Sequence, residues 1–322
     1  MTRDVDVIIL SWNRVDDTIA AIQSALEQEG VSKAVQIVDQ GSTPENLERI
    51  REVAARHPEV SLKELGGNVG VARGRNIATR MGSARIVVTL DNDAIFGDSQ
   101  TLARVVRRFE GEPSLGALAF RIINYYTRQD DEMCWDYPRV PTSHANQEFL
   151  VTRFIGAGNA IRREAFIAAG EYDETLFFGG EERDLSYRMV NLGYRIKYVP
   201  DLTVLHRVDP EARVRWNDGR YYYLVRNGLY TDYKFGMPFW RLARAAAASV
   251  VKGAYNGLLT QALRAVLDAT LMGIRFSRSN KRTSIYKLRK DARDYIDRCE
   301  RRGEESVWIR VRRHFAKLPG SV

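Results

Sequence analysis

The chain has 322 residues, a net charge of +8 at neutral pH and a hydrophobic content of 44%. This length and composition suit one large globular domain, alone or with an appendage, and argue against a disordered chain. The two cysteines, Cys134 and Cys299, lie far apart and outside any CxxC pattern. Their spacing excludes a disulfide framework and a thiolate metal site, and it favours a reducing compartment.

Charge is distributed unevenly along the chain. From Lys234 onward there are 20 Lys and Arg against 7 Asp and Glu, a net of +13, whereas the first 233 residues carry a net of −5. We therefore expect a mildly acidic body followed by a basic tail. Such a tail suits an anionic membrane, a nucleic acid or an acidic partner.

The first half of the chain alternates between short apolar runs and amphipathic stretches. The apolar runs predict strands at residues 5–10, 34–38, 60–65, 85–90 and 115–122. Helices are expected between them, at about residues 16–29, 44–57, 70–81 and 99–110. This alternation predicts βαβ units and a mainly parallel sheet, whose ligands bind at the carboxyl ends of the strands.

The second half is less regular. Residues 124–147 are aromatic and polar and predict a loop over the sheet. The elements expected after it are a strand-turn at 154–163, a short helix at 164–169, a charged helix at 181–192 and a strand at 195–199 that leads to His206. From about residue 220 the pattern is helical, apart from two turns.

Two carboxylates, Asp91 and Asp93, follow the fourth predicted strand in the segment LDND at residues 90–93. Carboxylates suit hard divalent cations such as Mg²⁺ and Mn²⁺, and those cations suit diphosphates. The alternative is a solvated turn that merely ends a strand.

Three acids, Glu181, Glu182 and Asp184, stand at the predicted start of a helix. Acids are favourable at a helix N-terminus in any case, and Arg188 one turn later is a partner for one of them. The preceding segment FFGG at 177–180 would deliver this helix start into a cleft. That position favours a general base with supporting carboxylates.

Residues 68–76 (NVGVARGRN) form a glycine-rich helix start with two arginines, Arg73 and Arg75. Such a start can hold an anion, although it matches neither GxGxxG nor the P-loop pattern. The alternative is a helix whose small residues pack close to the sheet. His206 is a candidate metal ligand because it follows a predicted strand downstream of the acids, although a lone histidine is usually structural.

The order of these segments resembles the inverting glycosyltransferases of family 2, which share the GT-A fold. The resembling segments are residues 7–14 (VIILSWNR), 38–43 (VDQGST), 68–76 (NVGVARGRN), 90–93 (LDND), 156–162 (GAGNAIR), 170–188 (GEYDETLFFGGEERDLSYR) and 221–227 (YYYLVRN). Bacterial enzymes that add rhamnose or similar sugars to surface glycans are the most similar by pattern. The resemblance implies an α/β GT-A domain over residues 1–235, with a Rossmann-like, mainly parallel sheet flanked by helices, and a basic helical extension over 236–322.

The resemblance also implies a divalent cation, Mn²⁺ or Mg²⁺, and a sugar donor linked to UDP, dTDP or GDP. The metal would be bound by Asp93, Asp91 and His206. The residues expected to bind the nucleotide sugar are Ser11, Asn13, Arg14, Asp39, Asn68, Arg73, Arg75, Asn76, Asp91 and Asn92. The residues expected on the acceptor side are Gly156, Ala157, Gly158 and Trp135.

By the same resemblance, Glu182 would deprotonate the acceptor hydroxyl. The commoner family pattern has Glu-Asp where this chain has Glu181-Glu182. Glu181 therefore stays an alternative base, and Asp184 is a third catalytic candidate. We find no QxxRW-like motif of the processive members, so we expect addition of one sugar to a glycan or lipid-linked glycan of cell-surface polysaccharide synthesis.

Residues 239–274 are predicted to form helices that rest on an anionic membrane surface. Their apolar stripe is Phe239, Ala243, Ala246, Val250, Ala254, Leu258, Ala262, Val266 and Thr270. Charged residues interrupt the run, so no stretch of about 20 uncharged residues exists to span a bilayer. The alternative is a helical pair that packs on the α/β domain or forms a homodimer. We expect a cytoplasmic protein, either free or peripheral on the inner face of the cell membrane.

Three functions of other classes compete with glycosyl transfer. A nucleotide-cofactor oxidoreductase would need GxGxxG and a paired acid about twenty residues later, which this chain lacks. A catalytically silent binding or scaffold protein with the same fold would not need to keep the carboxylates. Nucleic-acid binding by the tail is not expected, because Asp291, Asp294 and Asp297 interrupt its basic face.

Overall fold

The computed structural model describes residues 3–138, 141–208, 219–279 and 284–301. The strands are β1 (Val5–Ser11), β2 (Lys33–Asp39), β3 (Val60–Glu64), β4 (Ile86–Leu90), β5 (Ala94–Phe96), β6 (Leu115–Asn124), β7 (Phe149–Val151), β8 (Gly158–Arg162) and β9 (Arg195–His206). The helices are α1 (Val15–Leu26), α2 (Pro44–Arg56), α3 (Val71–Met81), α4 (Thr101–Gly111), α5 (Pro141–His144), α6 (Arg163–Ala168), α7 (Glu181–Asn191), α8 (Arg220–Lys234), α9 (Phe239–Tyr255), α10 (Leu259–Arg278) and α11 (Lys290–Glu300).

These elements follow the predicted order. The strands and helices expected in the first half are present, with ends that differ by a few residues from the prediction. β5 and β7 were not predicted, because a strand of three residues is too short to show a periodic pattern.

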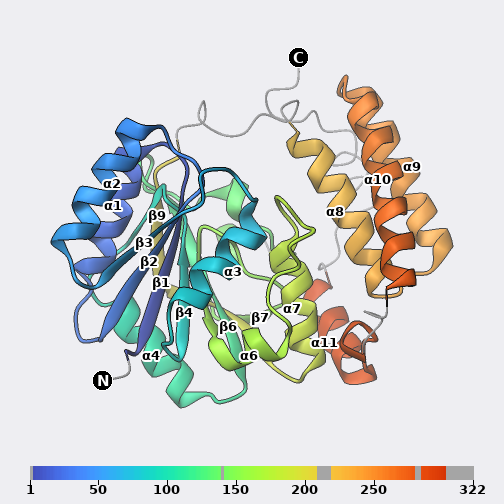
Figure 1. The fold of residues 1–322 in the computed structure, drawn as a ribbon. Coiled ribbons are helices and arrows are strands. Elements are labelled where there is room, and N and C mark those ends of the chain that lie inside the picture. The colour runs from blue at the N-terminus through green and yellow to red at the C-terminus, as the bar shows by residue number, and fades with distance from the viewer. Residues whose placement is uncertain (1–2, 139–140, 209–218, 280–283, 302–322) are drawn as a thin grey trace.

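The strands of the described residues form one nine-stranded sheet in the order β3-β2-β1-β4-β8-β6-β9-β5, and β7 pairs with β9 (Figure 1). β3, β2, β1 and β4 are parallel, as the βαβ pattern predicts. β8 runs antiparallel to both β4 and β6, whereas β6 and β9 are parallel. The sheet is therefore parallel in its first half and mixed in its second.

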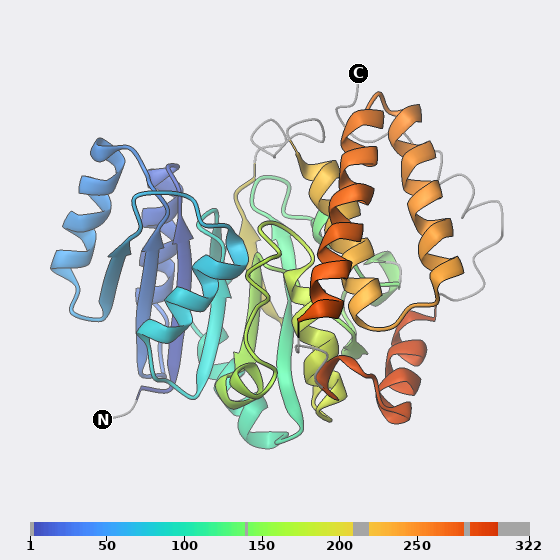
Figure 2. The same cartoon turned by 45° about the vertical axis from the view of Figure 1, so that its right-hand side comes forward.

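Helices cover both faces of this sheet (Figures 1 and 2). Val5, Val7 and Ile9 of β1 point to the face that α1, α2 and α4 cover, whereas Ile8 points to the face of α3. α6 and α7 continue the second face beyond α3. The alternation of side chains along each strand produces these two cores, because successive residues of a strand face opposite sides. The predicted α/β fold with flanking helices is confirmed.

Three helices, α8, α9 and α10, pack together beside the sheet (Figure 2). Leu258, Ala262 and Ala265 are buried against Tyr221 and Val225 of α8. Part of the stripe predicted to face a membrane thus packs inside the helical layer. Among the described residues, no helix is long and apolar enough to cross a bilayer.

The last described helix, α11, returns to the edge of the sheet. Its Tyr295 hydroxyl donates to the carbonyl of Val151 on β7 at 2.8 Å and accepts from the amide of Ile196 on β9 at 3.2 Å. The basic extension is therefore anchored to the α/β domain at this point as well as through α8.

Candidate active site

The carboxyl ends of β1, β2 and β4 meet at one edge of the sheet, because these strands are parallel. Ser11 pairs in register with Asp39, and Asp91 directly follows β4. The structure therefore brings together three polar segments that lie far apart in the sequence, as the prediction requires of a ligand site at this edge.

The turns after β1 and β2 are tied to each other. Asn13 and Arg14 both have positive φ angles, 55° and 49°. In this conformation the Asn13 amide N–H donates to Ser42 Oγ at 2.8 Å, and Asn13 Oδ1 accepts from the Thr43 amide at 3.0 Å. Two residues in a conformation that is uncommon for side chains other than glycine indicate a turn held by its surroundings.

Asp39 is buried, and its carboxylate accepts from the amides of Gly41 and Ser42 at 3.0 Å each. This carboxylate thus organises the turn after β2. Beside it, Trp12 is 55% exposed, whereas Ser11 before it is buried and Asn13 after it is half-buried. Trp12 was not among the predicted site residues, although an aromatic residue in a polar turn at the ligand edge was visible in the sequence.

Asp91, Asp93 and His206 form a group whose ligand atoms all lie within 4.8 Å of one another. The short strand β5 creates this group, because Ala94 pairs in register with His206 on β9 and brings Asp93 beside the imidazole. His206 Nε2 lies 3.3 Å from Asp93 Oδ1. Two carboxylates and an imidazole are a suitable donor set for Mn²⁺ or Mg²⁺.

The other nitrogen of His206 is held from behind. His206 Nδ1 lies 3.0 Å from Asp131 Oδ2 and 3.6 Å from Cys134 Sγ. A carboxylate behind a metal-binding histidine fixes the ring and its tautomer. Asp131 and Cys134 belong to the aromatic loop, and no pattern in the sequence identified them. They form a second possible metal group with His206, but the two hard carboxylates favour the group with Asp91 and Asp93.

Charges around this group are strongly coupled. Burial opposes protonation of His206, yet its hydrogen bonds to Asp131 and Asp93 raise its pKa to about 12. Burial also acts on Asp93, but the hydrogen bond and charge of His206, together with Arg14, hold the pKa of Asp93 below its ordinary value. Burial raises the pKa of Asp91, although Arg75 opposes the shift. His206, Arg14 and Arg75 thus oppose the negative charge of the two carboxylates.

The Arg14 side chain forms ion pairs with Asp93 and Asp17. Its Nη1 lies 2.6 Å from Asp93 Oδ2, and its Nη2 lies 2.9 Å from Asp17. The residue was predicted to line the nucleotide pocket, and the structure places it between that edge and the metal group.

Arg75 joins the metal group to the acidic start of α7. This guanidinium is 3% exposed and lies 2.7 Å from Glu182 Oε1, 3.2 Å from Asp91 Oδ1 and 3.4 Å from Glu181 Oε1. We predicted Arg75 as a ligand of the nucleotide sugar. In the structure its donors are directed at two carboxylates of α7 and one that follows β4, so it acts as their shared counter-ion.

The three acids of α7 occupy different environments. Glu182 lines a cavity of about 360 Å³ together with Phe178, Gly179 and Gly180. Glu181 is buried, and burial and the charge of Glu182 raise its pKa well above the ordinary value. Of these two acids, Glu182 is therefore the one that faces the cavity.

Asp184 lies away from this cavity. Its carboxylate is fully buried between Arg188 at 2.6 Å and Lys234 at 2.5 Å. Lys234 also pairs with Asp173 at 2.6 Å. The structure thus places this catalytic candidate in an ion cluster that joins α7 to α8.

Three small residues close the wall behind Glu182. A Cβ atom at Gly156 would lie 2.5 Å from Arg75 Nη2 and 2.7 Å from Glu182 Oε1. Ala157 accepts from the Asp91 amide at 3.3 Å, and Gly158 begins β8 beside Val204. These residues, predicted on the acceptor side, shape the space between the metal group and Glu182.

The remaining predicted residues make local contacts. The Asn68 side chain accepts from the Gly70 amide at 2.9 Å, and the Asn92 side chain donates to Thr18 Oγ1 at 3.2 Å. Asn76 donates to the Tyr172 carbonyl at 2.9 Å, and Arg73 lies 3.8 Å from Glu174. The Trp135 ring packs against the Tyr137 ring, with 5.1 Å between the ring centroids.

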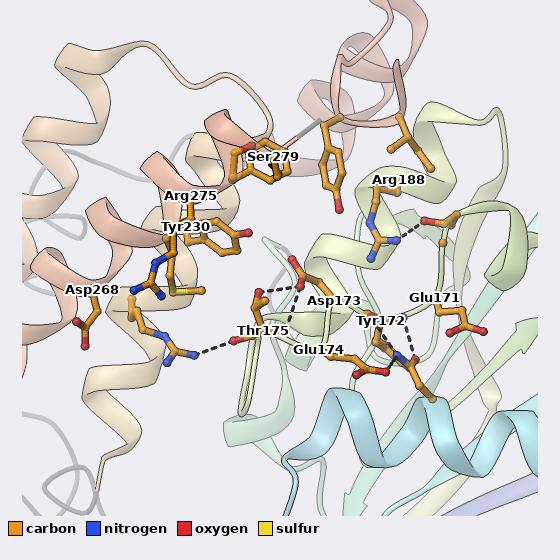
Figure 3. Close-up of a pocket in the computed structure, with 18 of the residues that line it drawn as sticks. Glu171, Tyr172, Asp173, Glu174, Thr175, Arg188, Tyr230, Asp268, Arg275 and Ser279 are labelled. Carbon is orange, nitrogen blue, oxygen red and sulfur yellow. Dashed lines mark hydrogen bonds between the residues drawn. The ribbon is translucent and has the colours of Figure 1, made fainter. Parts of the chain in front are cut away.

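A larger cavity of about 1020 Å³ lies between the segment 171–175 and the helices α8 and α10 (Figure 3). Arg226 donates to the Thr175 carbonyl across one side of it, at 3.3 Å. Tyr222, Arg226 and Tyr230 of α8 line it, whereas the cavity beside Glu182 is lined by Leu224 and Asn227 of the same helix. The two cavities therefore lie on different faces of α8.

Comparison with known proteins gives a consistent family. Residues 6–169, about half of the chain, match the family model described as glycosyl transferase family 2. An N-acetylglucosaminyltransferase of Bradyrhizobium diazoefficiens is 27% identical over 233 residues, which cover 66% of this chain and 48% of that protein. An N-acetylglucosaminyltransferase of Rhizobium meliloti is 27% identical over 217 residues, covering 62% and 50%. The chain thus spans about half the length of these relatives.

Solved structures show the same fold. A mannosyltransferase from Pyrobaculum calidifontis, in complex with GDP-Man and Mn²⁺, superposes with a TM-score of 0.58 and 22% identity, over 92% of this chain and 84% of that one. GalNAc-T7 with UDP, GalNAc and Mn²⁺ superposes with a TM-score of 0.60 and 15% identity, over 99% and 59%. With the family model and the strand-end carboxylates in agreement, this chain belongs to glycosyl transferase family 2.

Proposed function

We propose that the protein is an inverting, metal-dependent glycosyltransferase that moves one sugar from a nucleoside-diphosphate sugar to an acceptor hydroxyl. The observation that carries this proposal is the buried Arg75, which joins Glu182 on one side to Asp91 of the metal group on the other. Nη1 of Arg75 holds the base and Nη2 holds the metal group, so one guanidinium fixes the base and the site for the leaving group relative to each other.

A divalent cation fits the residues that are present. Asp91, Asp93 and His206 offer two carboxylate oxygens and an imidazole nitrogen within 4.8 Å of one another. A bound Mn²⁺ or Mg²⁺ would supply positive charge to the departing diphosphate. The residues of the chain prepare for this, because Asp131 orients the histidine and Arg14 neutralises the second oxygen of Asp93.

Glu182 is the proposed general base. It lies in the smaller cavity, and Arg75 fixes its carboxylate 2.7 Å away. The acceptor hydroxyl transfers its proton to Glu182 as its oxygen attacks the anomeric carbon, and the bond to the diphosphate breaks on the opposite side. One displacement of this kind inverts the anomeric centre. Glu181 is buried and does not line this cavity, so it is the supporting neighbour rather than the base.

The donor nucleotide, linked to UDP, dTDP or GDP, is proposed to rest on the turns after β1 and β2. Asn13, Ser42 and the buried Asp39 hold these turns together. The exposed Trp12 offers a flat ring beside them on which a base can stack.

The proposed acceptor is a glycan or lipid-linked glycan of cell-surface polysaccharide synthesis, made in the cytoplasm. Cys134 and Cys299 are present as thiols, which suits a reducing compartment. The relatives from Bradyrhizobium diazoefficiens and Rhizobium meliloti are named N-acetylglucosaminyltransferases, so UDP-GlcNAc is the first donor to examine.

The test is a screen of sugar nucleotides for release of the nucleoside diphosphate. UDP-GlcNAc, dTDP-rhamnose and GDP-mannose are each incubated with acceptor glycans, with Mn²⁺, with Mg²⁺ and with excess chelator. We expect release with one donor that depends on the cation. Donor binding without turnover for every acceptor would indicate a silent binding protein, and full turnover in chelator would remove the metal from the proposal.

A further inference from the structure

The helix α10 has two apolar faces, of which one is buried against α8 and the other is exposed. Leu258, Ala262 and Ala265 are buried against α8. A second stripe repeats every four residues and faces outward: Leu259, Leu263, Leu267 and Leu271. Leu263 and Leu267, in the middle of this stripe, are 52% and 60% exposed. Four leucines on one exposed face of a helix form a patch that a monomeric soluble protein rarely carries without a partner.

The neighbouring helix α9 also carries large apolar side chains outward. Phe239 is 83% exposed at the start of the helix, and Trp240, Val251 and Tyr255 are exposed along it. α9 and α10 pack against each other and lie on the outer side of the molecule, away from the sheet (Figures 1 and 2). Aromatic residues at the ends of such helices are typical of membrane–water interfaces.

The charge of α9 and α10 indicates what covers this face. Residues 239–278 contain six basic side chains, Arg241, Arg244, Lys252, Arg264, Arg275 and Arg278, and one acid, Asp268. Asp268 accepts from the Tyr222 hydroxyl of α8. The two helices that carry the exposed apolar side chains therefore have a net charge of +5. A second copy would bring two such charges together, whereas an anionic lipid surface complements them.

We propose that the exposed faces of α9 and α10 dock on an anionic lipid surface, with both helices lying along it. No helix of the described residues can cross a bilayer, so the contact is interfacial. Leu271 and Arg275 also line the larger cavity, so docking brings one wall of that cavity to the lipid headgroups (Figure 3). This inference does not depend on glycosyl transfer, because lipid binding is measured without donor or acceptor.

The experiment is flotation of the full chain with vesicles of phosphatidylglycerol and phosphatidylcholine in equal parts, and with pure phosphatidylcholine. At low salt we expect the protein to float with the anionic vesicles and to remain largely at the bottom with the neutral ones. Raising the salt should release it, because the basic side chains are exposed.

Substitutions separate the apolar from the electrostatic contribution. The double variant Leu263→Gln/Leu267→Gln should bind about 100-fold more weakly, at about tenfold for each buried leucine. Arg244→Gln and Arg264→Gln should each weaken binding to anionic vesicles by about fivefold, without effect on neutral ones. The matched control is Ile167→Gln, because Ile167 is equally exposed, at 59%, but lies on α6.

The double leucine variant changes exposed side chains, so its folding is checked by its melting temperature. Flotation of this variant equal to that of the unmodified chain would overturn the proposal. Absence of flotation with anionic vesicles would also overturn it. If in that case the mass in solution doubles with concentration and the double leucine variant stays a monomer, the face is a homodimer interface instead.

Discussion

Arg75 shows how one buried side chain can organise a site. Its guanidinium has carboxylates of α7 and of the segment after β4 within 3.4 Å, and it is almost fully buried. Alone, Glu181, Glu182 and Asp91 would repel one another in this cleft. The planar arginine fork contacts all three at once, which the single ammonium of a lysine would not do as well.

Substitutions of Glu182 and Glu181 are predicted to change the reaction rate by different amounts, although the two residues are adjacent in sequence. Glu182→Gln removes the proton acceptor, so we expect the rate to fall about 10²-fold or more while donor binding is retained. Glu181→Gln replaces a carboxyl whose pKa is raised well above its ordinary value, so the neutral amide should be tolerated far better. Steady-state rates and calorimetry with the free nucleoside diphosphate distinguish the two. An inactive Glu181→Gln beside an active Glu182→Gln would move the base by one residue.

His206 should make both stability and metal affinity depend on pH. Its folded-state pKa of about 12 lies above the unfolded value of about 6.5. Protonation therefore stabilises the metal-free fold fully below about pH 6.5. This contribution is lost as the pH rises toward about 12. Metal binding needs the neutral imidazole, so Mn²⁺ affinity should rise about tenfold per pH unit as long as the pH stays below the folded-state pKa of His206.

Melting temperatures without metal and calorimetry with Mn²⁺ across this range check both trends. His206→Asn should flatten them, because it removes the titrating group. His57→Asn, on the C-terminal side of α2, is the control and should leave them unchanged. A Mn²⁺ affinity independent of pH in the unmodified chain would contradict the role of His206 as a ligand.

At the scale of elements, the site depends on how short segments approach one another. The segment before β8 passes so close to α3 and α7 that a Cβ atom at Gly156 would lie 2.5 Å from Arg75 Nη2. Such a distance is below any normal contact, so one partner must shift. The close approach explains why a glycine stands here, on the wall between the base and the metal group.

Gly156→Ala should therefore displace Arg75 or Glu182 and lower the rate by about 10²-fold, because small misplacements of catalytic groups are costly. The fold should persist, since the change affects the cavity wall. The control is Gly111→Ala at the end of α4, where a Cβ atom meets nothing within 4 Å. Rates and melting temperatures of both variants decide. An unchanged rate for Gly156→Ala would mean that these side chains adapt at no cost.

At the scale of the whole molecule, a buried ion cluster joins the helical layer to the α/β domain. Lys234, at the end of α8, reaches Asp184 of α7 and Asp173 of the preceding loop at 2.5 and 2.6 Å. Burial opposes its charge, but Asp184 and Asp173 raise the pKa of Lys234 above its ordinary value. Asp184, which was expected to act in catalysis, thus belongs to this ion cluster between α7 and α8.

Lys234→Met should lower the free energy of unfolding by about 3–5 kcal/mol, because it leaves buried carboxylates without their shared cation. Urea denaturation measures the effect. Lys63→Met removes an exposed lysine on β3 and should change stability by less than about 0.5 kcal/mol. If Lys234→Met and the unmodified chain had equal free energies of unfolding, the packing of α8 on the α/β domain would not depend on this ion cluster.

The sequence alone was sufficient for the longer strands and helices and for the fold class. The apolar runs of β1, β2 and β4 and the helices between them are local patterns, and a parallel arrangement places their carboxyl ends at one edge. The residue types after these strands, above all Asp91 and Asp93, indicated a site for a cation and a diphosphate. Periodicity and residue chemistry are properties of short segments, so the sequence reveals them directly.

Contacts between distant segments were decided by the tertiary structure. β5 has three residues and no pattern of its own, yet its pairing with β9 sets Asp93 beside His206. Asp131 reaches His206 from a loop 75 residues away in sequence. α10 has two apolar faces of similar periodicity, and the face that is buried depends on α8. Each of these outcomes depends on contacts between segments that lie far apart in the chain. Local sequence patterns predict the segments but not which of them come into contact.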